Sequence, residues 1–413
     1  MVEPRVISLF SGAGGIDYGL EAAGFETAVA LEMDHDCCET LRTNRPGWPV
    51  IEANIFDITT DELLERGGLK KGAADLLVGG PPCQPFSKAG YWSRGDSLRL
   101  DDPRAHTLSA YMRVVEQALP HVFLLENVEG LAFAGKDEGL RLLQSQIAAI
   151  NKRTRSKYTP VVQVVSAAEY GVPQMRERVI MVAARDGALF KFPDVTHQAP
   201  ELRLDVVARL PTYRTAWDAL ADVKPGADEV LEIRGKWAEL LPSIPEGANY
   251  LHHTERGEGL PLFGWRRRYW SFLLKLAKDR PSWTIQAQPG PAIGPFHWDN
   301  RRLSVRELCR LQTFPDDVTL LGGRTSQQKQ AGNAVPSLLA EVIGRAIRSQ
   351  LLGQKVPKGH PRLLPPDRSP APPARPPGPV PRKFRKLAGE HEAHPGTGLG
   401  YGALSRQQLD SVG

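Results

Sequence analysis

The chain has 413 residues, of which 41% are hydrophobic and 24% are charged, and its formal net charge is +5. This length allows one large core and a second, smaller one, because single cores stop growing near roughly 250 to 300 residues. The sequence shows neither an apolar run of the ~18 to 20 residues that a membrane span needs nor a recognisable signal peptide, so we expect a cytoplasmic protein without a membrane partner.

The first 185 residues alternate short apolar runs with amphipathic segments. The runs VISLF, TAVALE, DLLVGG, HVFLLENV and VVQVV have the length and composition of buried strands, and helical patterns separate them. This alternation predicts an α/β catalytic domain over residues 1–185, with a mostly parallel sheet and a site at the carboxyl ends of its strands.

Three further regions follow the α/β pattern. Residues 186–300 are irregular and rich in Pro, Gly and Trp, which predicts a smaller second domain. Residues 301–352 regain helical periodicity and are expected to pack back on the first domain. Residues 353–413 are basic, with eleven prolines within 357–381, and are expected to form a disordered tail outside any core.

Positive charge gathers in two places, residues 255–306 and residues 353–413. Each region holds 10 Lys and Arg against 4 Asp and Glu, which leaves the rest of the chain near neutral or slightly acidic. Localised positive charge of this kind favours a polyanionic partner such as nucleic acid, although an exposed amphipathic helix would give a similar pattern.

A glycine-rich turn follows the first predicted strand and contains Phe10, Gly12 and Gly14. Glycines there let a ligand approach backbone N–H groups. Glu32, at the end of the next strand, could accept hydrogen bonds from two ribose hydroxyls, and Asp57, one unit later, could accept one from an adenine amino group. Each acid could equally be an ordinary surface residue.

The segment GGPPCQPFS, residues 79–87, follows an apolar strand and surrounds Cys83 with prolines. A rigid loop at a strand end would present this thiol instead of burying it, which favours a nucleophile. The other cysteines, Cys37, Cys38 and Cys309, are interpreted as core residues. The cysteine spacing indicates neither a zinc site nor a disulfide framework, so we expect no metal.

Two more strand ends carry charged residues. Glu126 and Asn127 end the run HVFLLENV, where partial desolvation would raise the pKa of the acid. Gln174, Arg176 and Arg178 precede another apolar run, and arginines at alternate positions of a strand share one face.

Together, FSGAGG, Glu32, Asp57, GGPPCQPFS, ENV, QMRER, RRLSVRELCRLQTFPD and QAGNAVP resemble, in this order, the bacterial DNA cytosine-5 methyltransferases over nearly all of residues 5–350. The resemblance implies a Rossmann-like methyltransferase fold with a smaller target recognition domain. It also implies methyl transfer from S-adenosylmethionine to carbon 5 of a flipped-out cytosine in a specific duplex, through a covalent Cys83 adduct. The protein would serve a restriction-modification system or act as an orphan methylase.

The resemblance also assigns roles to individual residues. Those expected around the cofactor are Phe10, Gly12, Gly14, Glu32, Met33, Asp57, Ile58, Asn333 and Pro82, which also borders the cytosine. Those expected to act on the cytosine are Cys83, Glu126, Asn127, Arg176 and Arg178. Those expected to touch DNA are Gln84, Ser87, Arg267 and Thr284. One departure is Thr107, which stands where the family usually has Leu, so either Thr107 or Leu108 would contact the cofactor.

The expected partner is double-stranded DNA, with any cognate endonuclease acting separately, and we expect a nucleoid-associated monomer. Two alternatives stay open at this point. The first is an RNA cytosine methyltransferase, although the Cys-Phe-Thr tripeptide of the tRNA-directed branch is absent after ENV. The second is a dinucleotide-binding oxidoreductase or an inactive DNA-binding module, against which the presence of Cys83, Glu126 and Arg178 argues.

Overall fold

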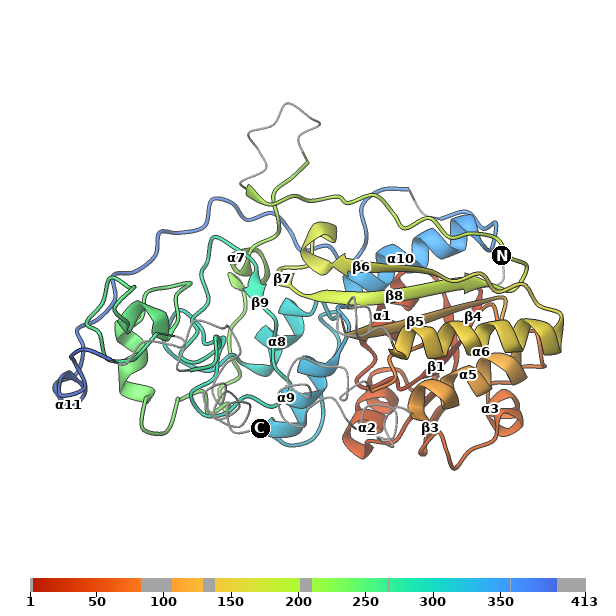
Figure 1. The fold of residues 1–413 in the computed structure, drawn as a ribbon, viewed down its shortest axis with the longest axis horizontal. Helices are drawn as coiled ribbons and strands as arrows, with labels where there is room; N and C mark the ends of the chain where they lie inside the picture. Colours follow the sequence, from red (N-terminus) through yellow and green to blue (C-terminus); the bar gives the residue numbers. More distant parts are fainter. Residues whose placement is uncertain are drawn as a thin grey trace, which may run out of the picture.

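The computed structural model describes residues 3–82, 106–128, 138–200, 210–265, 268–356 and 358–391. It has an α/β part and a smaller part with little regular structure, which lie side by side along the longest axis (Figure 1). Within the described ranges, no helix is long and apolar enough to cross a membrane.

A seven-stranded sheet forms the α/β part, in the order β3-β2-β1-β4-β5-β8-β6. Every neighbouring pair is parallel except those of β8, which runs antiparallel to β5 and β6. The strands are β1 Arg5–Leu9, β2 Glu26–Glu32, β3 Val50–Glu52, β4 Leu76–Gly79, β5 Val122–Val128, β6 Val161–Ser166 and β8 Glu177–Ala184. The predicted fold class, a Rossmann-like α/β methyltransferase fold, is confirmed.

Helices cover both faces of this sheet because its strands are apolar on both sides. In β1, Ile7 faces the core beneath α3 Thr60–Arg66, α5 His106–Ala118 and α6 Glu138–Thr154. The adjacent Val6 faces the opposite core, beneath α1 Gly15–Ala22 and α10 Ser337–Gln350. The remaining helix of this part, α2 His35–Asn44, follows β2.

Helix α10 lies against α1 although more than 300 residues separate them in sequence (Figure 1). A Cβ atom at Gly19 would lie 2.2 Å from the Ser337 carbonyl oxygen, so the two helices can approach this closely only because that residue is glycine. The C-terminal part of the chain therefore completes one face of the α/β core.

The smaller part is built around an aromatic cluster. Trp237, Tyr250, Phe263 and Phe272 pack on one another with ring centroids 5.1 to 6.0 Å apart. Its regular elements in the described residues are short, and Pro and Gly are frequent along this part of the chain. The smaller part contains the 3₁₀ turns Ala238–Ser243 and Tyr250–His253. The elements around the aromatic cluster and at the junction with the α/β part also include the two-stranded sheet of β7 Gln174–Met175 and β9 Ser282–Trp283, and helices α7 Ala216–Leu220, α8 Val305–Leu311 and α9 Arg324–Asn333.

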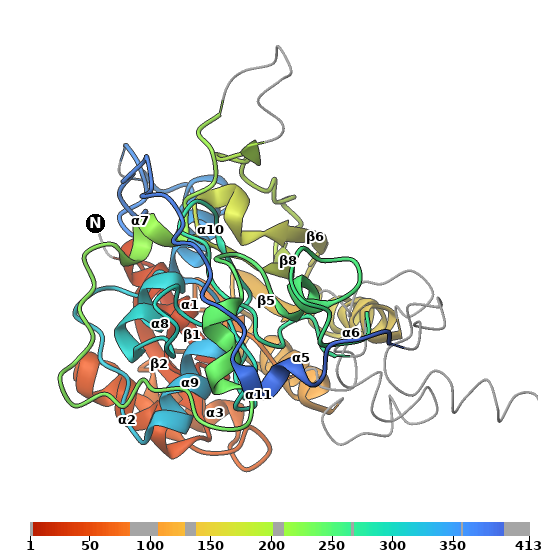
Figure 2. The same ribbon diagram turned by 90° about the vertical axis from the view of Figure 1, so that its left-hand side faces the viewer.

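Residues 358–391 follow the surface of both parts in a mostly extended path that contains the short helix α11 Arg382–Arg385 (Figure 2). The prolines keep this path irregular, as expected. The segment nevertheless differs from the prediction of a tail outside any core, because Phe384 is only 3% exposed and packs in the aromatic cluster. Residues 392–413 lie outside the described residues.

Candidate active site

A cavity of about 380 Å³ opens at the carboxyl ends of β1, β2, β4 and β5. This volume suits a small organic ligand. Both charged and apolar side chains line the cavity. Its wall is formed by Phe10, Ser11, Gly12, Ala13, Gly15, Ile16, Glu32, Met33, Asp34, Cys37, Gly80, Pro81, Pro82, Glu126, Asn127, Val128, Arg176, Arg178, Lys329, Gln330, Gly332, Asn333, Ala334 and Val335.

At one end of the cavity, the glycine-rich turn is tied to Glu32. The Gly12 amide donates to Glu32 Oε2 at 2.8 Å, and the amides of Met33 and Asp34 donate to Oε1 at 2.8 and 2.9 Å. Phe10 and Gly12 both have φ near 55°, a left-handed conformation that is strained for Phe10 and typical of functional turns. The carboxylate is therefore held in one orientation at the cavity wall.

An ion pair that the sequence analysis missed lies at the same end. Lys329 Nζ on α9 is 2.7 Å from Asp34 Oδ2, and this contact lowers the pKa of the Asp34 carboxyl. Asp34 also caps α2 by accepting from the Cys37 amide. The strand-end motif before α2 could have pointed to Asp34, but no local signal connects it to a lysine 295 residues later.

Three residues predicted to contact the cofactor do not line this cavity. Gly14 caps α1, where a Cβ would meet Leu41 and Tyr18 at 2.8 and 2.9 Å, so its role is to let the turn pack. Asp57 is exposed, and Ile58 packs into the core beneath α3 and α5. Asp57 and Ile58 follow Asn54 in the loop after β3, and that loop does not reach the cavity wall.

Thr107 and Leu108, the two candidate cofactor contacts in this segment, have different surroundings. Thr107 is 7% exposed, and its hydroxyl donates to the Pro82 carbonyl at 3.3 Å, so it braces a residue of the cavity wall. Leu108 packs in the core beneath α5 and is 1% exposed. Neither side chain lines the cavity.

The other end of the cavity holds an ion pair between Glu126 and Arg178. Arg178 Nε lies 2.8 Å from Glu126 Oε1, and the two side chains are 14% and 12% exposed. Burial raises the pKa of Glu126, although Arg178 and Arg176 oppose that shift. Burial also lowers the pKa of Arg178 despite its partner. Both charges are thus held in an environment that favours neutral forms, a state typical of catalytic groups.

Arg176 and Asn127 reinforce this end of the site. Arg176 is 2% exposed and donates to the Gly332 carbonyl at 3.0 Å, while its Nε and Nη1 make no hydrogen bond in the described part of the chain. Asn127 donates to the Pro81 carbonyl at 3.2 Å. A Cβ at Gly80 would lie 2.7 Å from Glu126 Oε2, so the loop after β4 passes directly beside this carboxyl.

Four predicted site residues lie outside the described residues: Cys83, Gln84, Ser87 and Arg267. The other three cysteines are buried free thiols, and burial raises the pKa of Cys38 and of Cys309 to about 12. Thr284 is described and lies away from the cavity, with its hydroxyl donating to the Met175 carbonyl at 2.6 Å. Thr284 thereby extends the pairing of β9 with β7.

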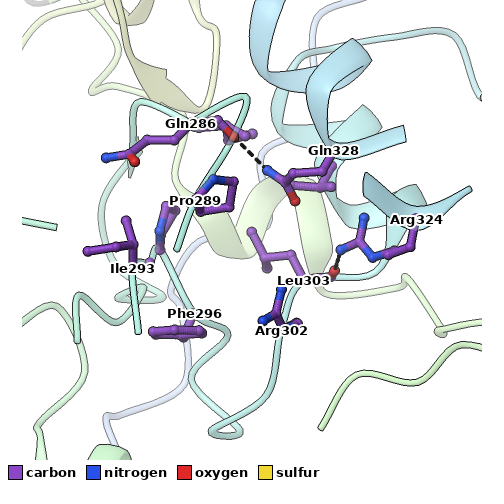
Figure 3. A pocket seen from close by; sticks show the side chains of 12 residues that line it. Gln286, Pro289, Ile293, Phe296, Arg302, Leu303, Arg324 and Gln328 are labelled. Atoms are coloured by element: carbon purple, nitrogen blue, oxygen red, sulfur yellow. Dashed lines mark hydrogen bonds between the residues drawn. The ribbon is translucent and has the colours of Figure 1, made fainter. Parts of the chain in front are cut away.

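A second, smaller pocket lies where α9 meets the irregular part (Figure 3). Its volume of about 30 Å³ suits one water molecule. Gln328 donates to the Gln286 carbonyl at 2.7 Å, and Arg324 donates to the Leu303 carbonyl. This pocket belongs to the junction between the two parts.

Comparison with known proteins identifies the family of this chain. The family described as C-5 cytosine-specific DNA methylase matches residues 4–349. The chain belongs to this family. Type II methyltransferase M.SacI of Streptomyces achromogenes is 43% identical over 375 residues, covering 84% of this chain and 94% of the relative. Type II methyltransferase M1.HphI of Haemophilus parahaemolyticus is 32% identical over 343 residues, covering 83% and 86%.

The solved structure of the Entamoeba histolytica methyltransferase EhMeth shares the fold. It aligns with a TM-score of 0.56 at 15% identity, covering 85% of this chain and 99% of that one. A C-5 cytosine-specific DNA methylase is an enzyme that methylates carbon 5 of cytosine in DNA, and the predicted recognition and enzyme class are confirmed. In this methylase, the cavity at the strand ends is the candidate active site.

Proposed function

We propose that this methylase transfers a methyl group from S-adenosylmethionine to a cytosine extruded from a specific duplex sequence, through a covalent adduct on Cys83. One observation carries the proposal: a single cavity joins Glu32, suited to ribose hydroxyls, to the Glu126 and Arg178 pair, suited to a cytosine edge. Cys83 follows Pro82, which lines the same cavity between the two ends.

The first end of the cavity fits the cofactor. Three of the roughly four lone-pair sites of the Glu32 carboxylate accept the N–H groups that orient it, and the remaining site on Oε2 can accept from a ribose hydroxyl. A Cβ at Gly12 would meet no atom within 4 Å, so the space beside the turn is open. S-adenosylmethionine, when bound, supplies an electrophilic methyl group. The residues proposed to hold it are Phe10, Gly12, Glu32, Met33, Pro82 and Asn333.

The second end suits activation of the pyrimidine ring. A cytosine must first gain electron density at carbon 5 before it can accept an electrophilic methyl group. A Cys83 thiolate that adds to carbon 6 supplies this density, while a protonated Glu126 donates to the ring nitrogen at position 3 and Arg178 donates to the ring carbonyl oxygen. The raised pKa of Glu126 supports this role, because burial favours the protonated form of the acid.

After methylation, the ring must return to aromaticity. The carbon 5 proton leaves to a base, the electron pair re-forms the double bond between carbons 5 and 6, and the sulfur–carbon bond breaks to release the Cys83 thiolate. Arg176 is buried beside the pair, and two of its guanidinium nitrogens have no hydrogen-bond partner among the described residues, so it would keep this end of the cavity positive while charge develops on the ring.

Duplex DNA can present a cytosine to this cavity only if the base leaves the stack. The reacting face of the ring is covered by neighbouring bases in a duplex, whereas the proposed thiol attack needs that face open. The energetic cost of extrusion, a few kcal/mol, must be met by contacts to the rest of the DNA.

Those contacts are assigned to the irregular part of the molecule, as the proposed recognition domain over residues 186–300. Its surface exposes Tyr269, Trp270 and Trp283, at 81%, 54% and 40%, beside Thr284. The Trp270 and Trp283 rings pack edge to face with centroids 5.6 Å apart. In the pairing of β9 with β7, Trp283 lies opposite Met175, the residue before Arg176 of the cavity wall, so this aromatic surface is joined to the chain that enters the candidate active site.

The test measures transfer of a radiolabelled methyl group to duplex DNA, followed by sequencing of the methylated cytosines. We expect carbon 5 methylation at one short sequence. Label in tRNA but not in duplex DNA would overturn the substrate assignment, and methylation at unrelated cytosines would overturn the claim of a specific sequence.

A further inference from the structure

The segment from residue 358 to residue 391, here called the strap, lies beyond the residues 4–349 that the family shares. It leaves the α/β part next to α10, crosses α7, and ends on the far side of the recognition domain (Figures 1 and 2). The strap is attached to the body of the enzyme at three places.

The first attachment is on α10. Glu341 is completely buried, and its carboxylate oxygens accept from the backbone amides of Arg362 and Leu363 at 2.6 and 2.9 Å. Arg345, one turn along α10, donates to the carbonyls of Gly359 and His360. A buried carboxylate is costly unless hydrogen-bonded, and Glu341 has two strap amides as partners besides Arg345 of its own helix at 3.4 Å.

The second attachment is on α7 and the residue before its capping box. Asp218 uses one oxygen to cap α7 and the other to accept from the Arg368 amide at 2.6 Å. Asp367 pairs with Arg214 at 2.8 Å, and the Arg368 side chain pairs with Asp222 at 2.8 Å. Charges of both signs on the strap thus meet opposite charges on the body.

The third attachment is in the aromatic cluster of the recognition domain. Phe384 stacks on Trp237 with centroids 5.6 Å apart and planes at 17°. The Gly378 amide donates to the Pro242 carbonyl at 2.9 Å, and Arg375 pairs with Asp299 at 2.9 Å. The strap therefore completes the core of this domain.

Between its attachments the strap is stiff. The prolines between the attachments are Pro365, Pro366, Pro370, Pro372 and Pro373, and proline-rich chain favours an extended path of about 3.1 Å per residue that acts as a semi-rigid spacer. A flexible chain would let the distance between two attachments change, whereas a stiff chain resists such changes.

We propose that the strap positions the recognition domain relative to the catalytic domain and so sets the separation between the site that binds the cytosine and the surface that binds the flanking duplex. This inference rests on the proposed function, because it assigns DNA to both surfaces. Loosening the strap would leave each surface intact but let their separation vary. DNA affinity would then fall while affinity for S-adenosylmethionine stayed the same.

The decisive variant keeps all three attachments and removes only the stiffness between them, by replacing Pro365, Pro366, Pro372 and Pro373 with serine. Two dyes, one at Lys152 on α6 and one at Glu255 in the recognition domain, report the distance between domains. We expect a broadened distance distribution, a rise in Kd for duplex DNA of about tenfold, and a Kd for S-adenosylmethionine within about twofold of the parent's.

Two further variants control for folding and for the chain end. Phe384→Ala loosens the third attachment alone and should broaden the distances in the same way, with the catalytic domain still binding S-adenosylmethionine. Removal of residues 392–413 should change neither distance nor affinity.

The distance measurement needs no DNA, so it separates the strap inference from the proposed function. The parent protein could fail to bind duplex DNA while the distance distribution still broadens in the serine variant. That result would support the positioning role of the strap and contradict the assignment of DNA as the substrate. Unchanged distances and unchanged DNA affinity in the serine variant would overturn the strap inference.

Discussion

Arg178 and Glu126 form their 2.8 Å ion pair across the antiparallel junction of β5 and β8. In that register Val128 pairs with Arg178 and Glu126 pairs with Ile180, so the two charged side chains are diagonal neighbours. Because β8 runs against β5, the start of β8 meets the end of β5 at the edge of the sheet that holds the cavity. The one reversed strand thus brings an arginine to the acid.

Glu126→Gln tests the role of the acid. An amide cannot transfer a proton to the ring nitrogen, so kcat should fall by about 10² to 10⁴-fold. Binding of S-adenosylmethionine, measured by calorimetry, should stay unchanged. Glu116→Gln is the matched control, because Glu116 only pairs with Arg153 on the surface of α5. Equal kcat in the Glu126→Gln variant and the parent protein would contradict the assignment.

Glu32→Ala should weaken cofactor binding by about 10 to 100-fold, the effect of losing charged hydrogen-bond acceptors worth about 1.5 to 3 kcal/mol. Glu26→Ala, at the exposed start of the same strand, should leave the affinity for the cofactor unchanged. Asp57→Asn should change the Kd by less than about threefold, because Asp57 does not line the cavity. A large effect of Asp57→Asn would show that the loop after β3 reaches the ligand when it binds.

Asp17 should make stability depend on pH. Its side chain is completely buried in α1, and burial raises its pKa from 3.8 to about 6, against a smaller lowering by Ser8. The stabilising contribution of the neutral acid is therefore present below about pH 3.8 and is lost as the pH rises through about 6. The shift corresponds to about 3 kcal/mol at neutral pH.

The measurement is urea denaturation of the parent and Asp17→Asn proteins at pH 4 and pH 7.5. The Asn variant should gain about 2 to 3 kcal/mol relative to the parent between these values. Titration of buried histidines such as His253, whose pKa burial lowers to about 4, affects both proteins and cancels in the difference. A difference that does not vary with pH would show that Asp17 is not buried as described.

Trp270 and Trp283 should contribute to DNA binding. One stack between an aromatic side chain and an unpaired base beside the extruded cytosine is worth about 1 to 3 kcal/mol, so the double alanine variant should bind duplex DNA about tenfold more weakly. Leu189→Ala, which removes another exposed apolar side chain, is the control. Equal DNA affinity in the double variant would place the DNA elsewhere on the molecule.

Local patterns were enough to predict the sheet and its strand ends. Runs such as VISLF are apolar on both faces, which is typical of central parallel strands, and Glu126 and Asn127 could be assigned to a strand end because they close such a run. The nearness of Glu126 to Arg178 could not be predicted, since it depends on the reversed direction of β8.

Contacts between distant parts of the chain left no local pattern. The pairing of Asp34 with Lys329, and that of β7 with β9, joins residues more than 100 positions apart. The proline-rich composition of residues 357–381 indicated an absence of regular structure but did not reveal the packing of Phe384, because one aromatic residue carries no periodicity.

A covalent Cys83 adduct can be trapped on duplex DNA that carries 5-fluorocytosine at the target position. Thiolate addition and methyl transfer can proceed on this base, but fluorine cannot leave carbon 5 as a cation, so the adduct should persist. With S-adenosylmethionine, the parent protein should give a complex that survives denaturing electrophoresis, and Cys83→Ser should give none while still binding DNA and cofactor. A stable complex with the Cys83→Ser protein, or methylation of ordinary cytosine by that protein at the parent's rate, would show that Cys83 is not the nucleophile.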